Sequence, residues 1–228
     1  MFPVIILSGG LATRMRPITE TIPKAMIKVH DKPFIHHQLA LLERNGISHV
    51  FLCVGYFGER IEKYIGNGSK YHIHVEYSYD GDTLLGTGGA IAKIGERLPD
   101  TFFVLYGDSY LDIAYQNIEN AYRVSGKKGL MTVFKNEDQW DTSNVIFQDN
   151  KLIKYSKTNK TKDMQYIDYG LGVLNKSAFA AFPTGTVFDL AAVYEQLSDK
   201  NQLEGYEVFE RFYEIGSPKG LADLGKKL

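Results

Sequence analysis

Long apolar runs alternate with amphipathic segments over the first half of the chain. The runs at 3–10, 49–56 and 101–113 are almost unbroken, which is typical of strands buried on both faces of a parallel sheet. Segment 72–79 alternates polar and apolar residues and predicts a further strand. Apolar residues at helical spacing predict helices at 32–47, 58–68 and 87–98. Strands that alternate with helices in this way indicate repeated βαβ units.

The pattern changes after about residue 128, where shorter alternating segments replace the long apolar runs. Asp149 and Asn150 are residue types that favour a turn, and they separate two of these segments. The predicted strands and hairpins are 128–135, 144–157, 165–179 and 207–216. The predicted helices are 189–201 and 217–228.

Both patterns belong to one predicted domain, because no long linker rich in proline or glycine separates them. We therefore predict an α/β fold with a single Rossmann-like, doubly wound, mostly parallel mixed sheet over residues 1–228. The domain divides into a first half, residues 1–127, and a second half, residues 128–228.

Composition narrows the class of protein. With 44% hydrophobic and 23% charged residues in 228, the chain can bury a sizeable core, and a net charge of -1 gives no support for a nucleic-acid partner. No apolar stretch is long enough to span a membrane and no signal peptide is recognisable, so we expect a cytoplasmic protein. The single cysteine, Cys53, excludes an internal disulfide and is expected in the core. The histidines are expected to be structural or exposed.

The segment from Leu7 to Met26 places adjacent glycines and several cationic side chains directly after the first predicted strand. Gly9 and Gly10 let backbone N–H groups approach phosphate oxygens, Arg14 can bind phosphate in bidentate fashion, and Lys24 supplies a point charge. The spacing matches neither a Walker A motif nor G-x-G-x-x-G. A plain turn with solvated arginines is the alternative, but this concentration of cationic residues favours a triphosphate site.

Three turns follow strands that should end at the same edge of the sheet, where ligands bind in open parallel folds. They are Gly9-Gly10, the loop around Gly55, and Gly107-Asp108. Asp108 is our predicted Mg²⁺ ligand, because Mg²⁺ prefers one or two carboxylates together with phosphate oxygens. Asp112 is a weaker candidate, and Glu214 is the candidate for the second carboxylate.

Two further segments suggest contacts to the rest of a ligand. Gly86 and Thr87 begin a glycine-rich helix entry that can press against a base or ribose, or is an ordinary helix start. Lys154 and Lys157 differ by an odd number, so on one strand they would point to opposite faces and one of them could reach the site. Asp168 and Gly170 interrupt an apolar strand and could bind a sugar hydroxyl.

These motifs together resemble the signature of the sugar-1-phosphate nucleotidyltransferases. That family's pattern is G-G-x-G-T-R-[LM]-x-P-x-T followed by P-K-P-[ML], and this chain reads GGLATRMRPIT and then PKAM. Ala12 and Ala25 stand where the family usually has glycine and proline. The segments LLGTGGAI, FFVLYGDSYLDI, YIDYGLGVL and FYEIGSPKGL look most similar to the D-glycero-D-manno-heptose 1-phosphate guanylyltransferase branch.

The resemblance implies a role for each candidate residue. The nucleotide would contact Leu7, Gly9, Gly10, Thr13, Gly86 and Thr87. Arg14, Lys24 and Asp108 would be catalytic. Lys157, Asp168 and Gly170 would bind the sugar phosphate, and Asp108 and Glu214 would bind Mg²⁺. The first half of the chain would therefore bind the nucleotide and the second half the sugar phosphate.

The implied reaction transfers a nucleotidyl group from an NTP, GTP in the closest branch, to a sugar 1-phosphate, and it supplies surface polysaccharide synthesis. A phosphate monoester is largely ionised at neutral pH, so no general base is needed, and catalysis rests on positioning and charge neutralisation. Two alternatives stay open: a cytidylyl- or uridylyltransferase acting on another phosphorylated substrate, and a non-catalytic nucleotide-sugar sensor. A homodimer is compatible with all three.

Overall fold

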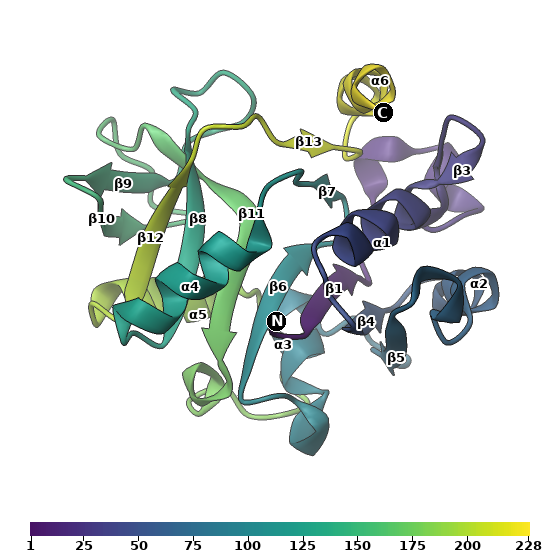
Figure 1. Ribbon diagram of the computed structural model, residues 1–228, viewed down its shortest axis with the longest axis horizontal. Helices are drawn as coiled ribbons and strands as arrows, with labels where there is room; N and C mark the ends of the chain where they lie inside the picture. Colours follow the sequence, from purple (N-terminus) through teal and green to yellow (C-terminus); the bar gives the residue numbers. More distant parts are fainter.

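A computed structural model describes all residues, 1–228, and its centre is one nine-stranded sheet (Figure 1). The strands of this sheet are β1 (Val4–Ser8), β4 (His49–Val54), β5 (His74–Tyr79), β6 (Thr101–Tyr106), β8 (Gly129–Lys135), β9 (Val145–Gln148), β10 (Lys151–Tyr155), β11 (Tyr166–Asn175) and β12 (Leu203–Val208). Two small ribbons pair β2 (Lys28–Val29) with β3 (Lys32–Pro33), and β7 (Ser109–Tyr110) with β13 (Tyr213–Glu214). The α-helices are α1 (Phe34–Arg44), α2 (Gly58–Ile65), α3 (Gly86–Ala92), α4 (Tyr115–Ser125), α5 (Ala191–Asp199) and α6 (Pro218–Lys227).

The strand order along the main path is β10-β9-β11-β6-β1-β4-β5. Off this path, β8 pairs with β11, and β12 pairs with the other side of β8. Pairing is parallel from β6 through β1 and β4 to β5, whereas β11 runs antiparallel to β6, β8 and β9. Strands from both halves of the chain therefore share one sheet. The predicted α/β fold with a mixed, mostly parallel sheet is confirmed.

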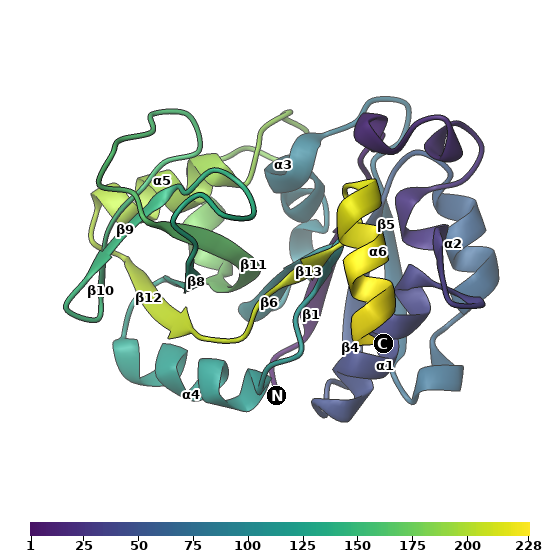
Figure 2. The same ribbon diagram turned by 90° about the horizontal axis from the view of Figure 1, so that it is seen from above.

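Helices cover both faces of the sheet, which explains why the central strands are apolar along their whole length. Figure 2 shows α1 and α4 on one side and α3 and α5 on the other. Alternate residues of the central strand β1 enter separate cores: Ile6 lies in the same core as Leu39 of α1, whereas Ile5 lies in the core that includes Ile91 of α3 and Leu197 of α5. All five of these side chains are buried. Burial of a side chain of this size contributes about 2 kcal/mol in each case.

Three elements differ from the expectations. Helix α4 was not predicted, because its segment is mostly polar and buries little beyond Tyr115, Ile118 and Glu119. The buried carboxylate of Glu119 accepts a hydrogen bond from the Phe2 backbone N–H at 2.7 Å and pairs with Arg123 at 2.8 Å, so this helix anchors the N-terminus.

The helix predicted at 87–98 stops at Ala92 and is followed by a 3₁₀ turn, where Gly95 has a φ of +62°. The strand predicted at 207–216 is wrong in its bounds. The chain pairs with β8 from Leu203 to Val208, leaves the sheet, and pairs again with β7 only at Tyr213 and Glu214.

The helices of this fold do not combine the length and the apolar character that a membrane-spanning helix requires.

Candidate active site

A cavity of about 980 Å³ opens at the carboxyl ends of the parallel strands, and both halves of the chain line it. The register of β1 with β4 and β6 brings the loops after these strands together. The predicted residues that line the cavity are Leu7, Gly9, Gly10, Arg14, Lys24, Gly86, Thr87, Asp108, Lys157, Asp168, Gly170 and Glu214. Thr13 is exposed on a 3₁₀ turn and does not line it.

Close approach of neighbouring loops explains two of the glycines at this edge. A Cβ built on Gly55 would lie 2.6 Å from the Gly9 carbonyl oxygen, and one built on Gly107 would lie 2.3 Å from the Leu7 carbonyl oxygen. Gly10 differs, because a Cβ there would meet no atom within 4 Å. Internal packing therefore does not require glycine at this position, and its main chain is open to the cavity.

Ala12 adopts a left-handed conformation, with φ 48° and ψ 46°. This backbone conformation costs a residue with a Cβ about 1 kcal/mol relative to glycine. The Thr19 hydroxyl donates a hydrogen bond to the Ala12 carbonyl oxygen at 2.9 Å and fixes the turn. Glycine adopts this left-handed conformation without strain, which explains why the family usually has glycine at this position. Alanine at this position makes the turn stiffer.

Two cationic and two acidic side chains lie close together in the cavity: Arg14, Lys24, Asp108 and Glu214. Lys24 Nζ lies 2.8 Å from Asp108 Oδ2. Asp108 and Glu214 are brought together by the β7–β13 ribbon, in which the Ile215 N–H donates to the Asp108 carbonyl oxygen at 3.0 Å. Arg14 has no ion pair with a carboxylate.

The side chains of Glu214, Lys24 and Arg14 all lie close to Gly216. A Cβ on it would lie 2.5 Å from Glu214 Oε2, 3.4 Å from Lys24 Nζ and 3.5 Å from Arg14 Nη2. The Glu214 carboxylate accepts hydrogen bonds from the Gly216 backbone N–H and, at 2.7 Å, from the Ser217 hydroxyl. The loop before α6 therefore orients this glutamate beside the two cations.

The glycine-rich start of α3 is packed against the segment before α5. A Cβ on Gly86 would lie 2.5 Å from the Phe188 carbonyl oxygen, and one on Gly88 would lie 2.2 Å from the Phe188 ring. The close packing against Phe188 is enough to explain why these positions are glycines, and no bound ligand is needed to explain them. Gly86 and Thr87 still line the cavity, and the Thr87 hydroxyl accepts a hydrogen bond from the Leu190 N–H at 2.8 Å.

Asp168 lies in the wall of the cavity formed by the second half of the chain. Its carboxylate accepts hydrogen bonds from the Gly170 N–H at 2.9 Å and from the Tyr106 hydroxyl at 3.0 Å. Burial raises the pKa of Asp168 to about 6, partly offset by these two donors. The register of β11 shifts beyond Asp168, and Gly170 has a φ of +97°, so this irregularity aims the carboxylate into the cavity.

Lys157 lies in the loop after β10, so strand alternation does not decide where it points. The Glu195 carboxylate fixes this loop by accepting hydrogen bonds from the Lys157 N–H and the Ser156 hydroxyl, both at 2.9 Å. The Lys157 ammonium pairs with Asp189 and lines the cavity. Lys154 lies on β10 itself and pairs with Asp199, outside the cavity.

The cavity is also lined by side chains that the sequence analysis did not select, among them Asp80, Tyr106 and Trp140. Asp189, just outside the lining, pairs with Lys157. Asp80 ends a parallel strand in the same way as Asp108, and this position was the signal that could have found it. Burial raises the pKa of Asp80, and its carboxylate accepts a hydrogen bond from the Leu85 N–H at 3.4 Å. Trp140 stands alone in an irregular loop, and only the fold shows that it reaches the cavity.

Cys53 is buried, as predicted, and its thiol lies 3.6 Å from the Ala90 carbonyl oxygen. Burial raises the pKa of this thiol far above its usual range. A thiol that stays protonated is a poor nucleophile. The cavity therefore has no activated cysteine.

Known proteins with related sequences identify the family. The "Nucleotidyl transferase" family model matches residues 3–222. The D-glycero-alpha-D-manno-heptose 1-phosphate guanylyltransferase of Campylobacter jejuni is 31% identical over 216 residues, which cover 94% of this chain and 95% of that protein. The UTP–glucose-1-phosphate uridylyltransferase of Synechocystis is 28% identical over 242 residues, which cover 97% of this chain but only 60% of that protein.

A solved structure supports the same fold. The HddC protein of Yersinia pseudotuberculosis, complexed with GMP-PN, aligns over 100% of this chain and 99% of its own with a TM-score of 0.80 and 21% identity. At that identity the alignment shows the shared fold and no more. Several of the curated relatives are longer than this chain, which spans about 60% of their length. The match over residues 3–222 nevertheless covers nearly the whole chain, and the protein belongs to the nucleotidyl transferase family of enzymes, as its sequence motifs indicated.

Proposed function

We propose that this protein transfers a nucleotidyl group from GTP to D-glycero-D-manno-heptose 1-phosphate. The products are a GDP-sugar for surface polysaccharide synthesis and pyrophosphate. The observation that carries the proposal is that one cavity brings Arg14, Lys24, Asp108 and Glu214 together and is lined by Asp168 and Lys157 as well. The cavity is large enough for both substrates, since ligand pockets commonly measure about 300–1,000 Å³.

The nucleotide half of the site neutralises the triphosphate. The open main chain at Gly10 donates N–H groups to phosphate oxygens, and Arg14, with no carboxylate partner, is free for the departing pyrophosphate. Lys24 exchanges its contact with Asp108 for a phosphate oxygen. Without these cations, the repulsion between two multiply charged substrates would prevent their contact.

The sugar half of the site binds the nucleophile. Lys157 binds the sugar phosphate, and one oxygen of that phosphate attacks the α-phosphorus. A bond forms between that oxygen and the α-phosphorus, and the bond to the oxygen bridging to the β-phosphate breaks with its electron pair. Asp168 accepts hydrogen bonds from sugar hydroxyls, and the backbone at Gly170 allows close approach of the ring.

The carboxylates of Asp108 and Glu214 fit a Mg²⁺ ion. The β7–β13 ribbon brings the two residues into one wall of the cavity, and two carboxylates beside phosphate oxygens are the donor set that Mg²⁺ prefers. When bound, the ion supplies Lewis-acid stabilisation of the charge that develops on the phosphoryl oxygens. Since both substrates are phosphorylated metabolites, we expect the protein to act in the cytoplasm, as a monomer or a homodimer.

A uridylyltransferase is the second candidate, and the 28% identity to the Synechocystis enzyme favours it. The test is a matrix of GTP, CTP, UTP and dTTP against heptose, mannose and glucose 1-phosphates with Mg²⁺, measuring pyrophosphate release and the mass of the product. We expect the highest kcat/KM for GTP with the heptose phosphate. A clear preference for UTP would establish the second candidate instead. Nucleotide binding without pyrophosphate release under any combination would contradict both.

A further inference from the structure

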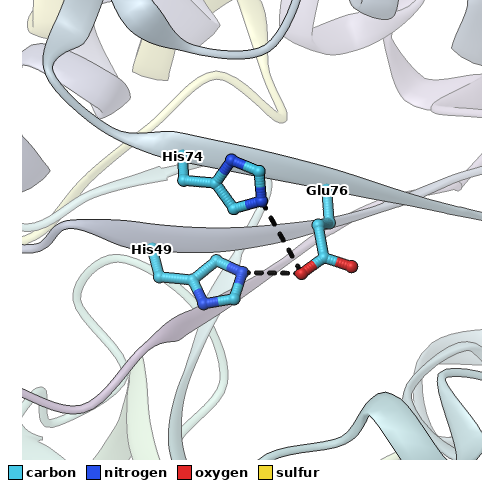
Figure 3. Close-up of side chains that lie close together, drawn as sticks. All are labelled: His49, His74 and Glu76. Carbon is cyan, nitrogen blue, oxygen red and sulfur yellow. Dashed lines mark hydrogen bonds and ion pairs between the residues drawn. The ribbon is translucent and has the colours of Figure 1, made fainter.

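At the opposite edge of the sheet, two histidines and a glutamate point at one another (Figure 3). His49 begins β4, and His74 and Glu76 lie on the edge strand β5. The register pairs His49 with His74, and Glu76 follows two residues later on the same face. None of the three lines the substrate cavity.

The two donor distances measured from Glu76 are compatible with a tetrahedral metal centre. Glu76 Oε1 lies 2.9 Å from His49 Nε2 and 3.9 Å from His74 Nε2, and all three ligand atoms lie within 4.8 Å of one another. With metal–ligand bonds of about 2.1 Å, neighbouring donors of a tetrahedral zinc site lie about 3.4 Å apart, which these two distances bracket. Two imidazoles and a carboxylate are also a zinc ligand set.

The surroundings hold two of the ligands in place. Arg97 Nη1 binds the other oxygen of Glu76 at 2.9 Å, which orients the carboxylate and leaves Oε1 directed at the histidines. The ring of His49 packs on the buried Phe51, with centroids 4.6 Å apart. His74 is the most exposed of the three, with 65% of its side chain accessible, so an ion can enter from solvent.

We propose that His49, His74 and Glu76 form a zinc-class site that links edge strand β5 to β4, independent of the substrate cavity. A water molecule or a ligand from outside the chain completes the tetrahedron. The positive charge of Arg97 lowers the affinity, so we expect weaker binding than at a zinc site with four protein ligands, and a stabilising rather than a catalytic role. Mg²⁺ does not compete, because imidazole nitrogen is a poor ligand for it.

The test is a calorimetric titration of the tag-free protein with Zn²⁺ in millimolar Mg²⁺, which saturates the carboxylates of the cavity. We expect one Zn²⁺ per chain and a rise in Tm of about 5 °C at hundred-fold excess over Kd. His74→Ala and Glu76→Gln should each weaken binding by at least ~10-fold and remove the rise in Tm. With Co²⁺, the wild-type protein should show the strong visible absorption of a tetrahedral site.

Two controls separate this site from others. His30→Ala removes an exposed histidine elsewhere, and Asp108→Asn removes a carboxylate of the cavity; both should keep the Zn²⁺ stoichiometry and the rise in Tm. The proposal is overturned if wild type shows no rise in Tm, or if His74→Ala binds Zn²⁺ as wild type does. Loss of binding in Asp108→Asn would also overturn it, because the ion would then belong to the cavity.

Discussion

Two walls of the cavity differ in their chemistry. The wall that we propose binds the nucleotide, called the nucleotide wall, carries long cationic side chains on short 3₁₀ turns, with Arg14 exposed and Lys24 paired only with Asp108. The wall that we propose binds the sugar phosphate, called the sugar wall, is built from β11 and the loops beside it, where the Asp168 carboxylate accepts two internal hydrogen bonds. The first wall offers charge that is neutralised when the ligand arrives, and the second offers a polar group that is already positioned.

This difference predicts different consequences of mutation. In the proposed reaction the nucleotide wall stabilises the charge that develops in the transition state, so its substitutions should lower kcat. Hydrogen bonds to an uncharged sugar ring are made equally in the ground state and the transition state, so substitutions in the sugar wall should raise KM for the sugar phosphate. The predictions below test this division.

Asp108→Asn should have the largest effect, a loss of about 10³-fold in kcat with the fold intact. The substitution removes the carboxylate proposed to bind Mg²⁺ and the partner of Lys24. Pyrophosphate release at saturating substrates and Mg²⁺ measures it. Asp112→Asn is the matched control, because that neighbouring aspartate pairs with Arg44 at 3.4 Å outside the cavity and should stay within about twofold of wild type. Equal losses in the two variants would exclude a specific role for Asp108.

Arg14→Ala should lower kcat by about 100-fold, which corresponds to roughly 3 kcal/mol of transition-state stabilisation. Arg14→Lys should recover part of the loss, because the charge returns without the bidentate geometry. Arg16→Ala in the same loop is the control, since Arg16 does not line the cavity. A loss below tenfold in Arg14→Ala, measured by single-turnover kinetics, would remove this arginine from the catalytic group.

Asp168→Asn tests the sugar wall through its pH dependence. The pKa of about 6 lies above the ordinary value for aspartate, so between pH 4 and pH 6 the folded chain retains a proton that the unfolded chain has released. Stability from this group is therefore complete below pH 4 and lost as pH rises through 6. We expect wild type to lose about 2 kcal/mol of unfolding free energy relative to Asp168→Asn between pH 4 and 7.

Urea denaturation at several pH values measures this difference. Asp163→Asn, at an exposed aspartate on the preceding loop, should follow wild type. Tyr106→Phe removes a donor that stabilises the ionised carboxylate, so it should extend the pH dependence to higher pH. Parallel pH profiles for wild type and Asp168→Asn would contradict the raised pKa.

Much of this picture could be predicted from the sequence, for a physical reason. Strands buried on both faces, such as 49–56, are apolar along nearly their whole length and can be recognised in the sequence. Because these strands are parallel, the loops that follow them place Gly9, Gly55 and Gly107 at one edge of the sheet. The loop that carries Gly9, Gly10, Arg14 and Lys24 is encoded locally, because all four lie in one segment of 18 residues, from Leu7 to Lys24.

The sugar wall is assembled from distant segments and was less predictable. Asp189 reaches Lys157 across 32 positions of sequence, and Tyr106 reaches Asp168 across 62. No local pattern signals such pairs, and the same is true of His49 and Glu76, which only the register of β4 with β5 brings together. Helix α4 escaped detection because it is mostly polar and attaches through a buried glutamate.

Asp189→Asn should have the smallest effect of these substitutions, and the effect should fall on KM and not on kcat. Asp189 holds Lys157 on one side, and its other oxygen accepts a hydrogen bond from the Thr87 hydroxyl at 3.3 Å, so it connects the two walls. Ionic and hydrogen-bonded contacts lower the pKa of this aspartate despite its burial, so it is charged at neutral pH. Asparagine keeps the shape but releases the ammonium of Lys157. We expect KM for the sugar phosphate to rise about tenfold with kcat nearly unchanged.

Asp199→Asn provides the matched control, because Asp199 pairs with Lys154 on β10 in a similar ion pair outside the cavity. Exposed pairs of this kind contribute less than about 1 kcal/mol, so neither kinetic constant should change. If Asp189→Asn instead lowered kcat as strongly as Arg14→Ala, the lysine would act on developing charge and the division between the walls would fail. A change confined to KM would show that Asp189 places Lys157 where the sugar phosphate binds.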